Sequence, residues 1–181
     1  MKLRTRFWIL GLLVLSSAFC GAETRTITHS FNKMFYKDSP RTLTLTNENK
    51  TGTAADRVIY ECTGGAVFSK NSYSGDSLAV FLTSSTAKVQ ISQIHNLDSL
   101  RIYYYPAADK SISVSYSTDG SSWTAATVRT PTNGIKTVRF PSVNDYYVRI
   151  ARASDNVYVW RLVYCTIDLS ADCPNCFIYK P

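Results

Sequence analysis

Hydrophobic and polar residues alternate along most of the chain after its first 22 residues. In the run 99–105, for example, Leu100, Ile102 and Tyr104 occupy every second position. Turn-forming residues such as glycine, proline, asparagine and aspartate separate these runs. Because successive side chains of a strand point to opposite faces, the alternation predicts short strands that bury one face. The predicted strands are 26–31, 41–46, 57–62, 66–69, 78–82, 88–92, 99–105, 111–117, 123–129, 137–140, 146–151 and 157–167.

The number of these runs and the composition together define a fold class. Many short antiparallel strands separated by turns predict an all-β sandwich or barrel. Serine and threonine make up 40 of the 181 residues and glutamate only three, a mixture that disfavours long helices. It excludes coiled coils, helical bundles, collagen-like chains and polytopic membrane proteins. We expect one β-sandwich domain, 23–169, followed by a short cysteine-containing tail, 170–181.

Residues 1–22 are typical of a secretory signal peptide. Three basic residues among the first six precede an apolar run, 7–19, and small residues follow it. Because the run is too short to span a bilayer comfortably, we expect cleavage and no membrane span in the mature chain. This places the protein outside the cell, in the periplasm or at the cell surface. A retained anchor is one alternative, and lipid attachment at Cys20 is another, although Phe19 stands where bacterial lipoprotein leaders have a small residue.

The charge that remains after cleavage is mild. The leader holds three of the 20 basic residues and none of the 13 acidic ones, which leaves a net charge of +4. No run of Lys or Arg longer than a pair occurs. Nucleic-acid binding requires a dense basic patch, so we expect no nucleic-acid partner. The sequence does not define an oligomeric state.

Four cysteines follow the leader, an even number that suggests disulfides in an exported protein. They are Cys62, Cys165, Cys173 and Cys176. One disulfide would join the strand that contains Cys62 to the strand that contains Cys165, and the Cys-Pro-Asn-Cys pair would close on itself. Free thiols, a zinc site and a redox motif are the alternatives, in that order.

Two segments in the second half of the chain carry a family likeness. Residues 113–124 read Ser-Val-Ser-Tyr-Ser-Thr-Asp-Gly-Ser-Ser-Trp-Thr, and residues 146–150 read Tyr-Tyr-Val-Arg-Ile. They resemble the second half of galactose-binding-like jelly rolls, which include the discoidin domains of coagulation factors and the family 32 carbohydrate-binding modules. The chain also looks like accessory sandwich domains of exported bacterial polysaccharide-degrading proteins, such as pectate lyases. The likeness covers roughly residues 97–165.

This resemblance implies an antiparallel β-sandwich of the jelly-roll, galactose-binding-like type with a carbohydrate ligand. It leaves room for a structural calcium ion held by loop carbonyls and aspartates, and no other cofactor is expected. Sugar-binding residues of that group lie on variable loops outside the matching motifs. The resemblance therefore transfers no individual residue to this chain.

The alternation itself suggests a binding surface made of arginine and tyrosine. Arg101, Tyr103 and Tyr105 share one face of a predicted strand, and Tyr147 points the same way as Arg149. If these strands are neighbours, a platform forms on which sugar rings stack and guanidinium groups bind hydroxyls or uronate carboxylates. The mild positive charge suits an acidic polysaccharide. The candidate ligand-binding residues are Arg101, Tyr103, Tyr105, Tyr147, Arg149, Arg161 and the loop residue Tyr73.

The competing interpretation is an ordinary solvated sheet face on which tyrosines cover the edge of the core. We expect Trp123 to pack beside the turn that precedes it and Trp160 to lie in the core. Alternation also places Arg161 on the face opposite Trp160.

No motif indicates catalysis. A glycosidase needs two carboxylates at a defined separation, and the aspartates here lie mostly in turns. The chain has two histidines and no Gly-x-Ser-x-Gly motif. We therefore expect a non-catalytic carbohydrate-binding domain. The alternatives are a protein-interaction or surface-adhesion domain of the cell envelope, and an enzyme of unidentified type that acts on polysaccharide.

Overall fold

The computed structural model describes residues 23–31, 41–45, 57–70, 78–105 and 112–168, in which the chain forms eleven strands. Every pairing between them is antiparallel, so the predicted all-β class is confirmed. The strands are β1 (Glu23–Ser30), β2 (Thr42–Leu45), β3 (Val58–Thr63), β4 (Val67–Lys70), β5 (Leu78–Leu82), β6 (Lys88–Tyr105), β7 (Ile112–Ser117), β8 (Thr124–Ala125), β9 (Val128–Thr132), β10 (Ile135–Arg152) and β11 (Val157–Asp168). Across the described ranges, no helix has the length and apolar character needed to cross a membrane.

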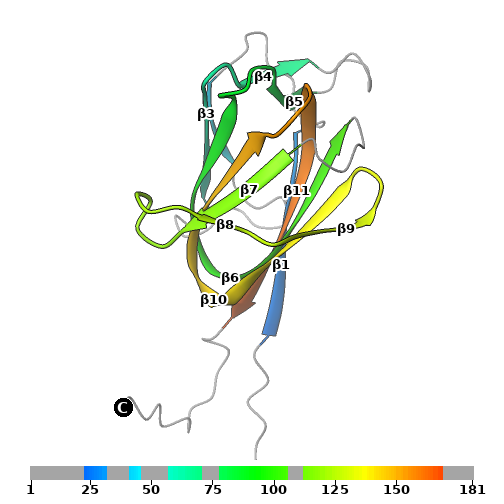
Figure 1. Cartoon of the computed structure of the whole chain (residues 1–181). Helices are drawn as coiled ribbons and strands as arrows, with labels where there is room; N and C mark the ends of the chain where they lie inside the picture. Colours follow the sequence, from blue (N-terminus) through cyan, green and yellow to red (C-terminus); the bar gives the residue numbers. More distant parts are fainter. Residues whose placement is uncertain (1–22, 32–40, 46–56, 71–77, 106–111, 169–181) are drawn as a thin grey trace, which may run out of the picture.

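The strands form two layers of a sandwich (Figure 1). The first layer, sheet I, has the order β2-β3-β6-β10-β7-β8 and uses the first half of β6 and the second half of β10. The second layer, sheet II, has the order β4-β5-β11-β6-β10-β9 and uses the other halves of the same two strands. Strand β1 pairs with the part of β11 that extends beyond β5. The two layers are therefore joined through β6 and β10.

Both long strands bend where they pass from one sheet to the other (Figure 1). In β6, Asn96 has a positive φ of 51°, and in β10 the register with β6 shifts repeatedly after Arg139. Asp145 joins the two bends, because its carboxylate accepts a hydrogen bond from the Asn96 N–H at 2.9 Å and lies 2.9 Å from His95 Nδ1. Bulges let a strand bend without ending. The four separate strands predicted in these regions are therefore two continuous ones.

The predicted strand 123–129 divides into two. Its first part, β8, pairs with β7 at the edge of sheet I, and β9 pairs with β10 at the edge of sheet II. The chain crosses between the sheets at Ala126 and Thr127, where the Ala126 N–H donates to the Val114 carbonyl at 2.9 Å. Residues 112–125 and β9 therefore belong to different layers.

The core lies between the sheets and follows the predicted alternation. Leu100, Ile102 and Tyr104 of β6 are at most 2% exposed, and Val148 and Ile150 of β10 are fully buried. Arg101 and Tyr103, which lie between them, face outward. The alternation therefore identified correctly which residues of these strands are buried.

A buried hydrogen-bonded group connects the two sheets. The Tyr60 hydroxyl of sheet I lies 2.8 Å from the Tyr164 hydroxyl and 2.6 Å from His29 Nδ1, both in sheet II. Burial, together with the neighbouring Tyr164, raises the pKa of Tyr60 well above its usual value, and burial raises the pKa of Tyr164 in the same direction. Both hydroxyls therefore stay protonated and remain available as hydrogen-bond donors.

The suggested disulfide between Cys62 and Cys165 does not form. Both are free thiols: Cys62 is buried in the core side of β3, and Cys165 is half-buried on β11, between the inward-facing Tyr164 and Thr166. The two thiols therefore face different environments in different sheets. Burial raises the pKa of the Cys62 thiol to about 12, which makes it unreactive. Cys173 and Cys176 lie outside the described residues, and their pairing stays a prediction.

Candidate functional site

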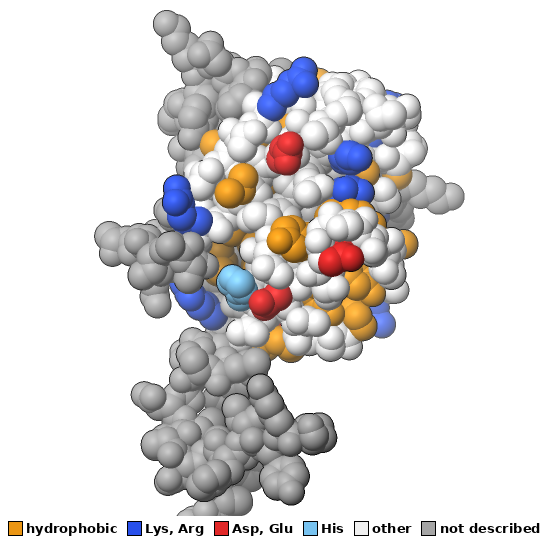
Figure 2. All heavy atoms as spheres, turned by 90° about the vertical axis from the view of Figure 1, so that its left-hand side faces the viewer, with side chains coloured by type: hydrophobic (Ala, Val, Ile, Leu, Met, Phe, Trp, Pro, Cys, Tyr) orange, Lys and Arg blue, Asp and Glu red, His pale blue; other side chains and the backbone are white. Residues whose placement is uncertain are grey.

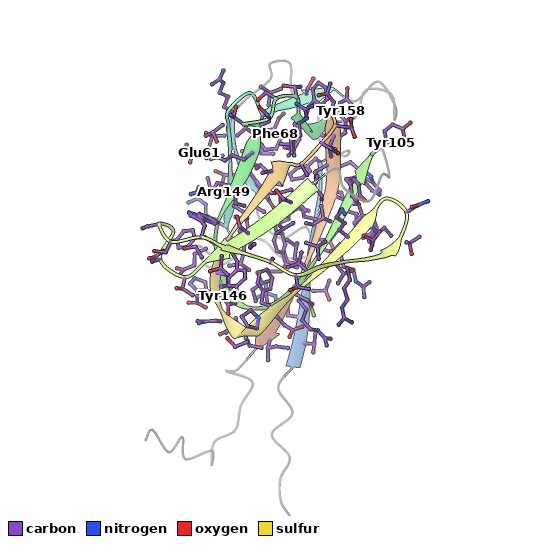
Figure 3. All side chains as sticks on the ribbon, in the orientation of Figure 1. Glu61, Phe68, Tyr105, Tyr146, Arg149 and Tyr158 are labelled. Atoms are coloured by element: carbon purple, nitrogen blue, oxygen red, sulfur yellow. The ribbon has the colours of Figure 1, made fainter. Side chains whose placement is uncertain are left out.

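The sandwich has two outer faces, and the side chains suggested as ligand contacts are divided between them. Face I, the outer surface of sheet I, carries Tyr147 and Arg149. Face II, the outer surface of sheet II, carries the other described candidates, Arg101, Tyr103, Tyr105 and Arg161. Figure 3 shows Arg149 on one side of the molecule and Tyr105 on the other. Tyr73 lies outside the described residues.

The bend in β10 is the reason for this division. Arg149, in the second half of β10, pairs with Gln90 in the first half of β6. Tyr103, in the second half of β6, has Ile135 and Arg161 as its neighbours on β10 and β11. The strands are adjacent, as the platform required, but the platform on face II lacks Tyr147 and Arg149.

Trp160 adds an aromatic ring to face II, and its predicted place in the core is wrong. The register between β11 and β6 shifts between Val159 and Arg161, so Trp160 is the extra residue of a bulge. Its ring centroid lies 5.2 Å from that of Tyr103, and the Arg161 guanidinium lies 5.1 Å from the Tyr103 ring. The bulge therefore places Trp160 and Arg161 on the same face, whereas strict alternation separates them.

A second aromatic group lies on face II, toward the end of the face that carries Tyr105. Phe81 and Tyr158 are stacked in parallel, with ring centroids 4.1 Å apart and an interplanar angle of 2°. Tyr158 is also in register with Tyr105, which is 37% exposed. Aromatic side chains therefore extend across β5, β11 and β6.

Arginines occupy the opposite end of face II. Arg101 on β6 is in register with Thr137 on β10, which is in register with Arg129 on β9. Arg139 follows two residues later on β10 and points the same way as Thr137. A groove of about 420 Å³ is lined by Thr127, Arg129, Thr137 and Arg139. This end of the face presents both guanidinium groups and hydroxyls.

No ion pair between described residues neutralises the exposed arginines of face II. Arg101, Arg129 and Arg139 are exposed, and none of them forms an ion pair with another residue of the described ranges. At the paired outward positions of the described strands of sheet II there is no aspartate or glutamate. Asp98, which is half-buried, is the extra residue of a bulge in β6 beside Ser99. Arg161 brings the number of arginines on this face to four.

Face I contains an arginine in a very different setting. The Arg149 guanidinium lies 3.7 Å from the ring centroid of Trp123, and its Nη2 donates a hydrogen bond to Gln90 Oε1 at 2.9 Å. Partial burial lowers the pKa of Arg149 from its ordinary value, yet arginine remains charged at any physiological pH. The side chain is therefore fixed in one orientation.

Arg149 is the second of five residues in a row of polar side chains that crosses sheet I. The row, one residue from each of β7, β10, β6, β3 and β2, consists of Ser115, Arg149, Gln90, Glu61 and Thr42. Neighbouring strands are about 4.8 Å apart, so the row is about 19 Å long. Figure 2 shows this side of the molecule, on which basic and acidic side chains are both present and neither forms a large patch.

The turn between β7 and β8 holds Trp123 in position. The Asp119 carboxylate accepts hydrogen bonds from the Ser122 and Ser121 N–H groups at 2.8 Å each and from the Ser117 hydroxyl at 2.7 Å. These hydrogen bonds, that of Ser122 first, hold the pKa of Asp119 well below its usual range. Gly120 has a positive φ of 74°, a conformation that is typical of glycine in an Asp-Gly turn.

Tyr147 supports the same turn. A methyl group added at Gly120 would lie 3.6 Å from the Tyr147 ring, so the ring packs against the turn. Its role in the structure is therefore to support the segment that carries Trp123.

The described residues contain one contact between a histidine and a carboxylate, that of His95 with Asp145. Burial alone would raise the pKa of Asp145, but hydrogen bonds from His95 and from the Asn96 N–H outweigh it and lower the value. Both residues belong to the bend that joins the sheets. Among the described side chains no three His, Cys, Asp or Glu residues lie together as metal ligands, and the structural calcium ion stays a prediction.

Sequence reasoning missed several of these groups. Arg129 and Arg139 each follow a hydrophobic residue of the sheet II strands, Val128 and Val138, so the alternation that identified Arg101 was also available for them. Trp160 had no such signal, because a single-residue bulge reverses the alternation without changing the composition. Arg149 and Trp123 lie in different segments of the chain, and no pattern in the sequence predicts that they are in contact.

Comparisons with known proteins show only distant structural similarity. No protein-family model and no curated protein sequence matches the chain. A family two carbohydrate esterase from Cellvibrio japonicus superimposes with a TM-score of 0.42 at 12% identity; the match covers 80% of this chain and 34% of the esterase chain. The chain thus spans about a third of that protein.

Two further solved structures are similar over nearly their whole lengths. The K2 cleaved adhesin domain of Lys-gingipain has a TM-score of 0.43 at 13% identity, with 77% of this chain and 99% of that chain covered. A chain from work on glycan recognition by the Ruminococcus flavefaciens cellulosome has a TM-score of 0.35 at 15% identity. The match covers 80% of this chain and 96% of that chain. At these values the similarity does not assign a function.

Proposed function

We propose that the chain is an exported, non-catalytic carbohydrate-binding domain and that face II binds an acidic polysaccharide. The observation that carries the proposal is the composition of this face: four arginines and a group of aromatic rings lie at outward positions of neighbouring strands, and no aspartate or glutamate lies at a paired outward position of the described part of these strands. The leader predicted at residues 1–22 supports export.

The two ends of face II suit two parts of such a ligand. Sugar rings present flat C–H surfaces that pack on aromatic rings, as the half-buried rings of Tyr103 and Trp160 offer. Uronate or sulfate groups accept paired hydrogen bonds from guanidinium groups such as those of Arg101, Arg129 and Arg139. Tyr105 and Arg101 are four residues apart on β6, which is about 13 Å along the strand. An extended chain of a few sugar units therefore reaches both ends.

The absence of catalysis is part of the proposal. The His95–Asp145 pair is engaged in the bend between the sheets, where Asp145 also accepts the Asn96 N–H. Glu61 of β3 lies on face I beside Gln90 and Thr42. A glycosidase would need a second carboxylate facing it. Sustained release of reducing ends from a polysaccharide by the purified protein would contradict this part.

Binding to charged and uncharged polymers of the same backbone tests the proposal. We expect calorimetry at low salt to show binding of dextran sulfate and of polygalacturonate. Uncharged dextran should show no binding that depends on the arginines of face II. Replacing Arg101, Arg129 and Arg139 together by Gln should weaken binding at least about tenfold. A matched control, in which Arg41, Arg57 and Lys88 near sheet I are replaced by Gln, removes the same charge and should retain most of the affinity.

Two results would overturn the proposal. One is that neither acidic polymer binds. The other is that the control variant loses as much affinity as the face II variant, which would mean that only the net charge of the protein matters.

A protein-interaction domain is the second candidate, and one observation favours it. Val67, Phe81 and Tyr158 lie in register at outward positions of β4, β5 and β11, and they form an apolar end of face II. Partly exposed apolar side chains that lie together are typical of protein contacts. Loss of protein capture from the cell envelope by Phe81→Ser, with dextran sulfate binding unchanged, would support this second function.

A further inference from the structure

We infer that face I is a second binding site, for an uncharged carbohydrate, centred on Arg149 and Trp123. This inference goes beyond the acidic-polysaccharide function proposed for face II. It depends on different residues in a different sheet, so either proposal can fail without the other.

The first argument is that Arg149 and Gln90 of face I are held in place before any ligand binds. Arg149 is fixed between the Trp123 ring at 3.7 Å and Gln90 at 2.9 Å. Its Nε is buried and has no hydrogen-bond partner in the described part of the chain. A rigid donor loses little conformational freedom on binding, which favours recognition of a weakly binding ligand such as a sugar.

The second argument is the order of the row. Across five adjacent strands the row presents a hydroxyl (Ser115), a guanidinium donor (Arg149), an amide (Gln90), a carboxylate acceptor (Glu61) and a second hydroxyl (Thr42). Glu61 is exposed and has no hydrogen bond or ion pair with the residues described. Sugar hydroxyls both donate and accept hydrogen bonds, so a row that offers both kinds of group is complementary to them.

The third argument is charge. Arg149 and Glu61 carry opposite charges on either side of Gln90, so the row is neutral as a whole. For a ligand that spans the row, attraction to one of these charges is offset by repulsion from the other, so neither an anion nor a cation gains a net advantage. Trp123 adds an aromatic ring beside Arg149, and sugar C–H surfaces pack on such rings. The chemistry of face I therefore selects an uncharged sugar.

The two faces lie on opposite sides of a sandwich whose sheets pack about 10 Å apart. A single straight polysaccharide cannot contact both. The domain can therefore hold two chains at once, one acidic and one uncharged, and bridge them.

The tryptophans allow each face to be observed separately. The chain has three: Trp8 in the predicted leader, Trp123 on face I and Trp160 on face II. In the Trp8→Phe, Trp160→Phe variant, fluorescence reports on Trp123. The probes are cellohexaose, xylohexaose, mannohexaose and maltohexaose, each titrated with and without saturating dextran sulfate.

We expect at least one of these oligosaccharides to shift Trp123 fluorescence saturably, with or without dextran sulfate. Arg149→Lys, which keeps the charge but loses the planar guanidinium, should weaken binding about tenfold. Glu61→Gln, an exposed position with no fold-critical contact, should weaken it severalfold. The matched control is the triple Gln variant of Arg101, Arg129 and Arg139, which should bind within about twofold of the parent.

Three outcomes would overturn the inference. They are no fluorescence shift with any of the four probes, unchanged affinity in the Glu61→Gln variant, and loss of binding in the face II triple variant. A failure of dextran sulfate to bind, with oligosaccharide binding intact, would contradict the proposed function of face II and leave this inference standing.

Discussion

Face I and face II share two strands, β6 and β10, yet their arginines are in opposite situations. Strands β6 and β10 supply outward-facing residues to both faces, because each strand bends from one sheet into the other. On face I, Arg149 is held by Trp123 and Gln90. On face II, Arg101, Arg129 and Arg139 are exposed and have no ion pair with described residues. The difference lies in the side chains that surround each arginine.

This comparison separates two uses of one residue type. A guanidinium that is stacked and hydrogen-bonded stabilises the fold and is ready to orient a ligand. Several like charges at one end of a face repel each other and contribute no stability to the folded chain. The acidic ligand that we propose for face II would bind where such charges lie together. Stability measurements on matched variants therefore distinguish the two faces without any ligand.

The largest effect is expected where the two sheets meet. Tyr60→Phe removes the hydroxyl that His29 and Tyr164 contact, and it leaves both partners buried with one hydrogen bond fewer. We expect the free energy of unfolding to fall by about 3 kcal/mol, because an unpaired buried polar group costs about 1–3 kcal/mol. Urea unfolding followed by circular dichroism measures this change.

Tyr158→Phe is the matched control for this variant. Tyr158 is half-buried on face II, where its ring stacks on Phe81 and its hydroxyl has no hydrogen bond with the described residues. Its loss should cost less than about 0.5 kcal/mol. If Tyr60→Phe unfolds in two steps instead of one, the two sheets do not share a single cooperative core. The stabilities of face I and face II variants would then refer to different unfolding steps and could not be compared directly.

Stability should fall by a smaller amount when Arg149 is changed. Arg149→Gln removes the contact with Trp123 and the hydrogen bond to Gln90. A cation–π contact of this kind is worth about 0.5–1 kcal/mol when partly exposed, so we expect a loss of about 1 kcal/mol together with a change in the fluorescence of Trp123. An unchanged midpoint in urea would contradict the fixed position that we assign to Arg149.

The sequence predicted the strands and their buried faces, and it did not predict how the strands are connected in space. Alternation depends on local side-chain chemistry, so Leu100, Ile102 and Tyr104 were correctly placed in the core. The bend at Asn96 has no such signal, because it depends on a hydrogen bond to Asp145, 49 residues away. The predicted strands on either side of each bend therefore looked independent.

The candidate residues show the same limit. The sequence identified Arg101, Tyr103 and Arg161 as outward-facing, and the structure places them on one surface. It grouped Arg149 with them because its alternation is identical, although the bend in β10 carries Arg149 to the other face. Deciding which outward-facing residues share a surface requires the pairing of strands, which alternation does not contain.

The smallest effect on stability is expected at the arginines of face II, and this makes it the sharpest test of the comparison. Arg139→Gln makes the same chemical change as Arg149→Gln on the same strand, but Arg139 is exposed and has no ion pair within the described ranges. We expect the free energy of unfolding to change by less than about 0.5 kcal/mol, and to increase slightly at low salt because a repelling charge is removed. Urea unfolding at low and at high salt measures both effects. A loss as large as that of Arg149→Gln would mean that Arg139 stabilises the fold, and the contrast between a fixed arginine and an unpaired one would disappear.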